Sequence, residues 1–343
     1  MCEVAARTAM RIGVIGGGSF GTALARLLAE LDHPVSLWFR NPALAQAVAE
    51  QRENPEYLPG FRLPETVHCT HDIAAAVGAQ ELLVVVTPSH VLRAVMTQAR
   101  PFITGRPYIV SASKGIEERT LHRMSQVLVD VLGPECSGRI AALSGPSFAR
   151  EVAAGMPTAV TAAAVDTDTA ETVQAVFRGP TFRVYSSTDL VGVELGGAVK
   201  NVIAIAAGVS DGLGLGNSSR AALITRGVAE IARLVAKMGG HAQTVSGLSG
   251  VGDMVLTCTG DLSRNRTIGV RIGRGEDLED ILQSMRMVAE GVRNSVSVAT
   301  LARRVGVEMP ITEQVRLMLH EGKPAIQAVG DLMRRQSKPE FWS

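Results

Sequence analysis

Short runs of β-branched and aliphatic residues alternate with helix-like segments along the first half of the chain. Residues 11–15 and 35–39 predict strands, and the alanine and leucine spacing of residues 20–31 and 42–52 predicts a helix after each. Residues 82–86 form a continuous apolar run, which is typical of a strand buried on both faces. This alternation predicts an α/β domain with a parallel sheet. Further strands are expected at 108–112, 140–143, 158–164 and 182–185, and a helix at 168–177.

The pattern changes after about residue 189, because no further segment has the composition of a strand. Residues 192–208 predict an apolar helix, and residues 219–238 predict an amphipathic helix with Asn217 and Ser218 as candidate caps. Two more helices are expected around 278–285 and 311–319. We therefore expect an α/β domain over residues 1–189 and an all-α domain over residues 190–343.

Charge and composition exclude several classes of protein. With 34 Lys and Arg against 33 Asp and Glu, the net charge is +1, which gives no electrostatic reason to expect nucleic acid as a partner. The 46% hydrophobic content excludes a disordered chain. Four scattered cysteines suit a reducing compartment. The chain start lacks an apolar run of signal-peptide length, and uncharged apolar stretches such as residues 201–210, half a membrane span long, are too short to cross a bilayer. We expect a cytoplasmic protein without a membrane span.

A glycine-rich motif follows the first predicted strand and opens the first predicted helix. Gly16, Gly18 and Gly21 form GxGxxG, which gives a tight turn, close backbone approach to a pyrophosphate and close helix packing. Such a motif alone can be an ordinary turn, but this context predicts a Rossmann-type dinucleotide-binding domain. Arg40 ends the second strand where NAD-binding proteins carry an acidic residue, and an arginine there suits a 2′-phosphate. The hypothesis is NADP(H) as preferred cofactor, with NAD(H) also accepted; the alternative is that Arg40 is merely solvated.

Three loops after predicted strands carry further candidate chemistry, since α/β sites lie at the carboxyl ends of strands. Pro88 provides an apolar surface that could face a nicotinamide, and Lys114 is placed to contact an anion. Residues 143–149 offer N–H groups and hydroxyls that could also bind an anion. Each of these loops could equally be ordinary turn chemistry.

The helical half contains a lysine in an apolar setting. Lys200 interrupts the predicted helix 192–208, and burial would lower its pKa toward a value that suits acid–base catalysis. The alternative is a side chain that reaches the surface. Downstream, Asp253 lies in a glycine-rich loop, and residues 263–265 (Ser-Arg-Asn) at a predicted helix start resemble a phosphate clamp.

Five segments together resemble the bacterial type of NAD(P)-dependent glycerol-3-phosphate dehydrogenase. They are GGGSFGTALA at 16–25, SASKG at 111–115, SGPSFA at 144–149, GAVKNVIAIAAGVSDGLGLGN at 197–217 and SRN at 263–265. The resemblance covers residues 11 to about 335. It implies reversible hydride transfer between NAD(P)H and dihydroxyacetone phosphate, supply of glycerol 3-phosphate for phospholipid synthesis, and a homodimer.

The resemblance also assigns roles to individual positions. It implies Lys200 as the catalytic acid–base, without a metal. Cofactor contacts fall on Ser19, Phe20, Arg40, Lys114, Ala149, Arg264, Val288 and Glu290, beside Gly16, Gly18, Gly21 and Pro88. Substrate contacts fall on Lys114, Gly145, Ser147, Lys200, Asp253, Ser263, Arg264 and Asn265.

Three other functions remain open at this point. A related dehydrogenase of hydroxy acids or sugar acids would not need a phosphate clamp, and a cofactor-sensing module would bind NADP(H) without turnover. A metal-dependent alcohol dehydrogenase would need ligands, but His68 and His71 are the close histidine pair and suit a surface strand. Many of the 35 glycines lie between Gly192 and Gly275, where we expect them to allow close approach to a small substrate.

Overall fold

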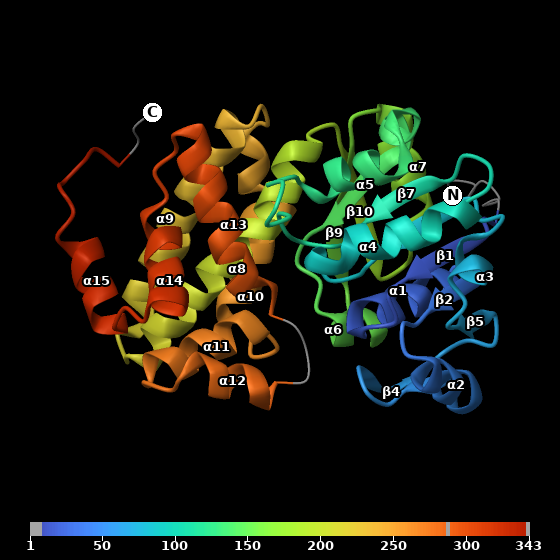
Figure 1. The fold of residues 1–343 in the computed structure, drawn as a ribbon, viewed down its shortest axis with the longest axis horizontal. Helices are drawn as coiled ribbons and strands as arrows, with labels where there is room; N and C mark the ends of the chain where they lie inside the picture. The colour runs from blue at the N-terminus through green and yellow to red at the C-terminus, as the bar shows by residue number, and fades with distance from the viewer. Residues whose placement is uncertain (1–8, 286–288, 341–343) are drawn as a thin grey trace.

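The computed structural model describes residues 9–285 and 289–340, which form a sheet domain and a helical domain side by side (Figure 1). The sheet has eight strands in the order β10-β9-β8-β7-β6-β1-β2-β5. Its strands are β1 Ile12–Ile15, β2 Val35–Trp38, β5 Val67–Thr70, β6 Leu82–Val85, β7 Tyr108–Ser111, β8 Ile140–Ser144, β9 Thr158–Ala164 and β10 Phe182–Ser187. A separate antiparallel pair joins β3 Glu53–Asn54 to β4 Leu58–Arg62.

Helices cover both faces of the sheet, because its central strands are apolar on both sides. All four residues of β6 are fully buried, as the apolar run predicts. The helices of this domain are α1 Ser19–Glu30, α2 Pro42–Gln51, α3 Ile73–Val77, α4 Ser89–Ala99, α5 Met124–Leu132, α6 Ala149–Ala153 and α7 Thr167–Phe177. Leu82 and Val84 pack toward α1 and α7, whereas Leu83 and Val85 pack toward α3, α4 and α5.

The sheet is parallel, as predicted, except at one pair, because β8 and β9 run antiparallel. The connection between them contains only α6, a helix of five residues. A crossover between parallel strands is usually built on a longer helix that carries the chain back along the sheet. Here the chain turns back at the same edge of the sheet, where Ser144 of β8 pairs with Thr161 of β9.

The helical domain is built around α8 Leu190–Gly212. This helix is long and apolar enough to span a membrane, but 94% of its most apolar segment is buried inside the protein. Among the described residues it is the one helix of such length and hydropathy. The other helices are α9 Gly216–Lys237, α10 Asp253–Thr259, α11 Arg264–Gly273, α12 Leu278–Ser284, α13 Glu290–Val305, α14 Pro310–Glu321 and α15 Ala325–Met333.

Glycines bring α8 and α11 unusually close. A Cβ on Gly208 would lie 2.9 Å from the Cα of Gly269, and one on Gly212 would lie 3.0 Å from the Cα of Gly273. Without side chains at these positions the two backbones can touch. These four glycines therefore serve helix packing, and the expectation that the glycines of this half serve close approach to the substrate does not hold for them.

The predicted start of α9 is also wrong. The helix begins at Gly216, ahead of both candidate caps, and neither Asn217 nor Ser218 caps it. Gly214 and Gly216 have positive φ angles of +73° and +82°, so the chain makes its turn into α9 on glycine rather than on a capping side chain.

Candidate active site

The GxGxxG motif forms the turn between β1 and α1, and each glycine has a distinct environment. Gly16 has a φ of +127°, which a residue with a side chain rarely adopts. A Cβ on Gly21 would overlap the carbonyl oxygen of Gly16, so α1 can pack this close to the turn only with glycine there. A Cβ on Gly18 would meet no atom within 4 Å. The turn thus leaves open space at Gly18, next to the free N–H groups that begin α1.

Two polar residues hold this turn: Ser19, which the resemblance had named, and Asn54, which the sequence patterns did not identify. Asn54 is fully buried, and its Nδ2 donates to the carbonyl of Gly17 at 3.0 Å and to Thr22 Oγ1 at 2.9 Å. Ser19, in the first turn of α1 beside Phe20, donates its hydroxyl to the carbonyl of Tyr57 at 2.7 Å. Asn54 and Tyr57 lie in and beside the small β3–β4 pair, which has no helical or strand periodicity to reveal it.

The candidate residues follow neighbouring strands in spatial order. Arg40 follows β2, Gly16 follows β1, Pro88 follows β6, Lys114 follows β7 and Gly145 follows β8. These five strands are adjacent and mutually parallel, so their carboxyl ends meet along one edge of the sheet. Arg40 is exposed at one end of this row, which is the position of a group that could contact a ribose phosphate.

Glu290 ties the loop after β6 to the helical domain. Its carboxylate accepts a hydrogen bond from Ser89 N at 2.9 Å and another from Ser89 Oγ at 2.5 Å. Ser89 directly follows Pro88 and begins α4, while Glu290 begins α13. The contact therefore fixes Pro88 from the helical side. Val288 lies outside the described residues.

The centre of the site is a carboxylate between two lysines. Lys200 is 6% exposed, so the prediction that it is buried is confirmed. Its ammonium group contacts Asp253 Oδ1 and donates to Thr257 Oγ1 at 2.8 Å. The ammonium of Lys114 contacts Asp253 Oδ2 at 2.6 Å. Asp253 begins α10 rather than lying in a loop, and it joins the lysine of the sheet domain to the lysine of the helical domain.

Burial and charge together set the protonation of this cluster. Burial lowers the pKa of Lys200 to about 8; Asp253 opposes this shift and Lys114 adds to it. Burial by itself raises the pKa of Asp253, but the two ammonium groups outweigh it, and that pKa lies below its ordinary value. A lysine with a pKa near neutrality can both donate and accept a proton.

The loop after β8 lies beside Lys114. The ammonium of Lys114 donates to the carbonyl of Gly145 at 3.4 Å, and the hydroxyl of Ser147 donates to the same carbonyl at 3.0 Å. Gly145 has a φ of +149° and packs closely on Val160 of β9. Ala149 begins α6, so this loop also ends at a helix.

The Ser-Arg-Asn segment forms the start of α11, as predicted. Ser263 is the N-cap, and its Oγ accepts from Arg266 N at 3.2 Å. Asn265 is buried and donates to Asn201 Oδ1 at 3.0 Å, which ties the segment to the residue next to Lys200. Its own Oδ1 accepts from Gly291 N at 3.0 Å. Arg264 is exposed at the same helix end. The segment therefore places a hydroxyl, a guanidinium and an amide at one helix start beside α8, which is chemistry that suits a phosphate.

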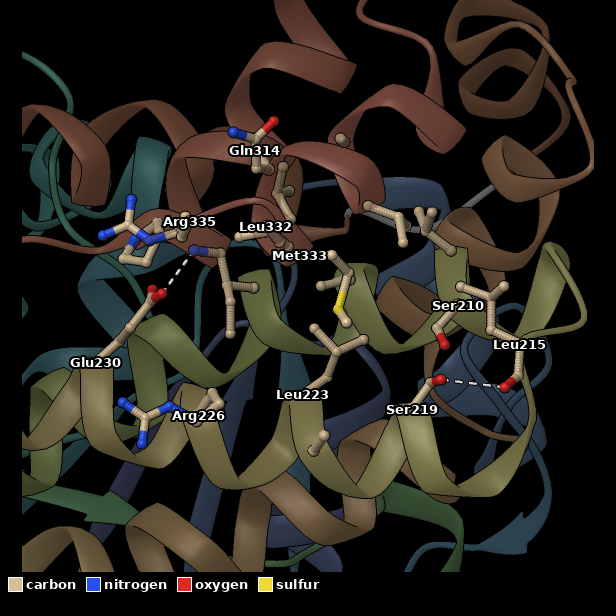
Figure 2. A pocket seen from close by; sticks show the side chains of 18 of the residues that line it. Ser210, Leu215, Ser219, Leu223, Arg226, Glu230, Gln314, Leu332, Met333 and Arg335 are labelled. Atoms are coloured by element: carbon tan, nitrogen blue, oxygen red, sulfur yellow. Dashed lines mark hydrogen bonds between the residues drawn. The ribbon is translucent and has the colours of Figure 1, made fainter. Parts of the chain in front are cut away.

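The described residues also bear on two other kinds of site, a metal centre and a ligand cavity. Within residues 9–285 and 289–340 there is no group of three His, Cys, Asp or Glu that could hold a metal. A cavity of about 700 Å³ lies elsewhere, between α8, α9, α14 and α15. Figure 2 shows its apolar side chains, among them Leu223, Leu332 and Met333, with Glu230 at one side.

Comparison with known proteins gives the family. The N-terminal and C-terminal models of NAD-dependent glycerol-3-phosphate dehydrogenase match residues 11–170 and 189–330. The glycerol-3-phosphate dehydrogenase [NAD(P)+] of Geobacter sulfurreducens is 54% identical over 332 residues, covering 97% of this chain and 99% of that protein. The protein of the same name from Koribacter versatilis is 50% identical, covering 97% and 99%.

Solved structures agree with this match. The crystal structure of glycerol-3-phosphate dehydrogenase from Coxiella burnetii has a TM-score of 0.91 and 39% identity, covering 95% of this chain and 99% of that one. D-mandelate dehydrogenase shares the fold alone, with 12% identity, 93% and 100% coverage and a TM-score of 0.62. The fold is thus shared with hydroxy-acid dehydrogenases, but the sequence match is specific. This chain belongs to the NAD-dependent glycerol-3-phosphate dehydrogenase family.

Proposed function

We propose that this chain catalyses the reversible reduction of dihydroxyacetone phosphate to sn-glycerol 3-phosphate with NAD(P)H. The observation that carries the proposal is the cluster of Lys200, Asp253 and Lys114, placed between the carboxyl edge of the sheet and the start of α11. The proposed site thus consists of a proton donor in this cluster, the glycine-rich turn that suits a dinucleotide and the helix start that suits a phosphate. The division into domains at residue 189 fits this arrangement, since β10 ends at Ser187 and α8 begins at Leu190.

The residues of the turn fit a dinucleotide. The open space at Gly18 and the start of α1 suit a pyrophosphate, with Ser19 and Phe20 beside it. We propose NADP(H) as the preferred cofactor because Arg40 is free to face a 2′-phosphate, with NAD(H) as the second. When bound, the nicotinamide supplies the hydride to C2 of the ketone. Pro88 is proposed to pack beside the nicotinamide, and Glu290 holds Pro88 in place through its hydrogen bonds to Ser89.

Lys200 is the proposed acid–base. As an ammonium it donates a hydrogen bond to the ketone oxygen, stabilises the negative charge that develops there and then transfers a proton to it. In the oxidative direction neutral Lys200 takes the proton from the hydroxyl. Asp253 and Thr257 orient the amine, since both contact Nζ.

The phosphate is assigned to Ser263, Arg264 and Asn265, with Lys114, Gly145 and Ser147 closing the other side. A substrate of three carbons has few other groups to contact, so a fixed phosphate is what places C2 for hydride transfer. We further propose, from the family, a metal-free cytoplasmic homodimer that supplies glycerol 3-phosphate for phospholipid synthesis.

The test is steady-state oxidation of NADPH by the purified chain with dihydroxyacetone phosphate and, separately, with dihydroxyacetone. The proposal expects turnover with the phosphorylated ketone and a kcat/KM at least about 100-fold lower without the phosphate, consistent with the loss of charge-assisted contacts. Equal rates would contradict the phosphate site. Binding of NADPH without turnover of either ketone would instead favour a cofactor-sensing protein.

A further inference from the structure

Helix α13 makes a second contact with the sheet domain, one turn beyond Glu290. Asn294 is fully buried, and its side chain makes three hydrogen bonds to three backbone groups. Its Nδ2 donates to the carbonyl of Lys114 at 3.3 Å and to the carbonyl of Ala198 at 3.2 Å, and its Oδ1 accepts from Ile116 N at 3.4 Å. One amide thus joins the loop after β7 to helix α8.

The two joined segments carry the two lysines of the site. Lys114 itself provides one of the carbonyls, and Ala198 lies two residues before Lys200 on α8. Gly115 is packed between α13 and α4, because a Cβ there would lie 3.1 Å from Asn294 Oδ1 and would overlap the Ser89 side chain. The loop therefore has little freedom to move while Asn294 holds it.

Glu290 and Asn294 are four residues apart, so they lie on the same face of α13. Glu290 holds the loop after β6 through Ser89, and Asn294 holds the loop after β7. The first turns of α13 therefore position two adjacent loops of the sheet edge against the helical domain.

We propose that Asn294 is a positioning residue, which fixes the Lys114 loop against α8 so that both ammonium groups meet on the carboxylate of Asp253. It does not touch the reacting atoms. The proposal rests on the proposed function, because its effect is read through the protonation of Lys200. Loss of these hydrogen bonds is expected to let Lys114 move away from Asp253.

The consequence has a definite sign. Lys114 lowers the pKa of Lys200, so its departure raises that pKa, and a carboxylate shared with one ammonium instead of two raises it further. Oxidation of glycerol 3-phosphate requires neutral Lys200. Its rate should therefore begin to rise only at a higher pH than in the wild type.

The variants are Asn294→Leu, which removes all three hydrogen bonds at similar volume, and Asn294→Ser, which keeps a hydroxyl that can donate to one carbonyl. Ser295→Ala is the matched control. Ser295 is also fully buried on α13, but its hydroxyl bonds within the helical domain, to Val292 O at 2.6 Å and to His320 Nε2 at 3.0 Å.

The measurement is the pH profile of kcat/KM for glycerol 3-phosphate oxidation, together with the KM for dihydroxyacetone phosphate. We expect Asn294→Leu to move the acid limb of this profile to higher pH by half a pH unit or more and to raise the KM several-fold. Asn294→Ser should move the limb less, in the same direction, and decides the question if the leucine variant does not fold.

A merely structural residue would lower kcat but leave the acid limb of the pH profile and the KM at their wild-type values. That result would overturn the proposal. So would a limb displaced equally in Ser295→Ala. Failure of the wild-type protein to turn over either substrate would instead remove the proposed function, which keeps the two outcomes distinct.

Discussion

Replacing Asp253 by asparagine removes the carboxylate that both lysines contact and leaves the size of the side chain unchanged. In the wild type this carboxylate raises the pKa of Lys200, while burial and Lys114 lower it, with about 8 as the result. Two unit charges about 4 Å apart interact with about 4 kcal/mol at an effective dielectric constant of about 20. One pKa unit corresponds to about 1.4 kcal/mol, so the pKa of Lys200 is expected to fall by up to about 3 units, to about 5.

The reductive reaction should reveal this shift, because it requires Lys200 as an ammonium. At about pH 7.5 the protonated fraction would fall from about three quarters to below about one per cent, which lowers kcat/KM by roughly 100-fold. The assay is NADPH oxidation by dihydroxyacetone phosphate across the pH range of stability. We expect Asp253→Asn to keep gaining activity as the pH falls below about 7, where Lys200 of the wild type is already almost fully protonated.

Asp168→Asn is the control, since Asp168 is exposed in the first turn of α7. It should leave the profile unchanged. If Asp253→Asn lost activity uniformly at all pH values, the reasoning that Asp253 sets the protonation of Lys200 would be refuted.

Three further predictions concern the cofactor, the helix packing and the buried acid. Arg40→Asp should shift the ratio of kcat/KM for NADPH over NADH toward NADH, and an unchanged ratio would show that Arg40 does not contact the 2′-phosphate. Gly269→Ala should lower the free energy of unfolding by about 1–3 kcal/mol in a denaturant titration, because its Cβ overlaps the backbone of α8; Gly138→Ala, where a Cβ meets open space, should not. Burial raises the pKa of Glu230 to about 7 from about 4.5. Between these two pH values the folded state holds a proton that the unfolded state releases, so the free energy of unfolding should fall as the pH rises through this range. Glu230→Gln should flatten this fall in Tm, and an equal fall in both proteins would contradict it.

The sheet was predictable because its strands carry strong local patterns. The apolar run at β6 and the GxGxxG motif are signals that depend only on neighbouring residues. The antiparallel β9 was not predictable in this way, because its direction depends on the course of the connection from β8 rather than on the composition of the strand. The start of α9 was missed because glycines at positive φ made the turn, where capping side chains were expected.

The site shows the same division. Lys200 was identified because a single cation on an apolar helix is conspicuous, and burial bears this out. Asn54 and Asn294 were not identified, because a buried amide has no sequence signature. The role of each depends on hydrogen-bond partners that lie far away in the sequence. The glycines at α8 and α11 were visible in the sequence, but their purpose required the helix crossing to be seen.

The central claim is that Lys200 transfers the proton, and Lys200→Ala tests it most directly. The measurement is kcat for reduction of dihydroxyacetone phosphate at saturating NADPH, with the Kd for NADPH determined in parallel by fluorescence. We predict a fall in kcat of about 10²- to 10⁴-fold, which is the usual contribution of general acid–base catalysis, with a Kd close to that of the wild type. A variant with intact NADPH binding and near wild-type kcat would contradict the account.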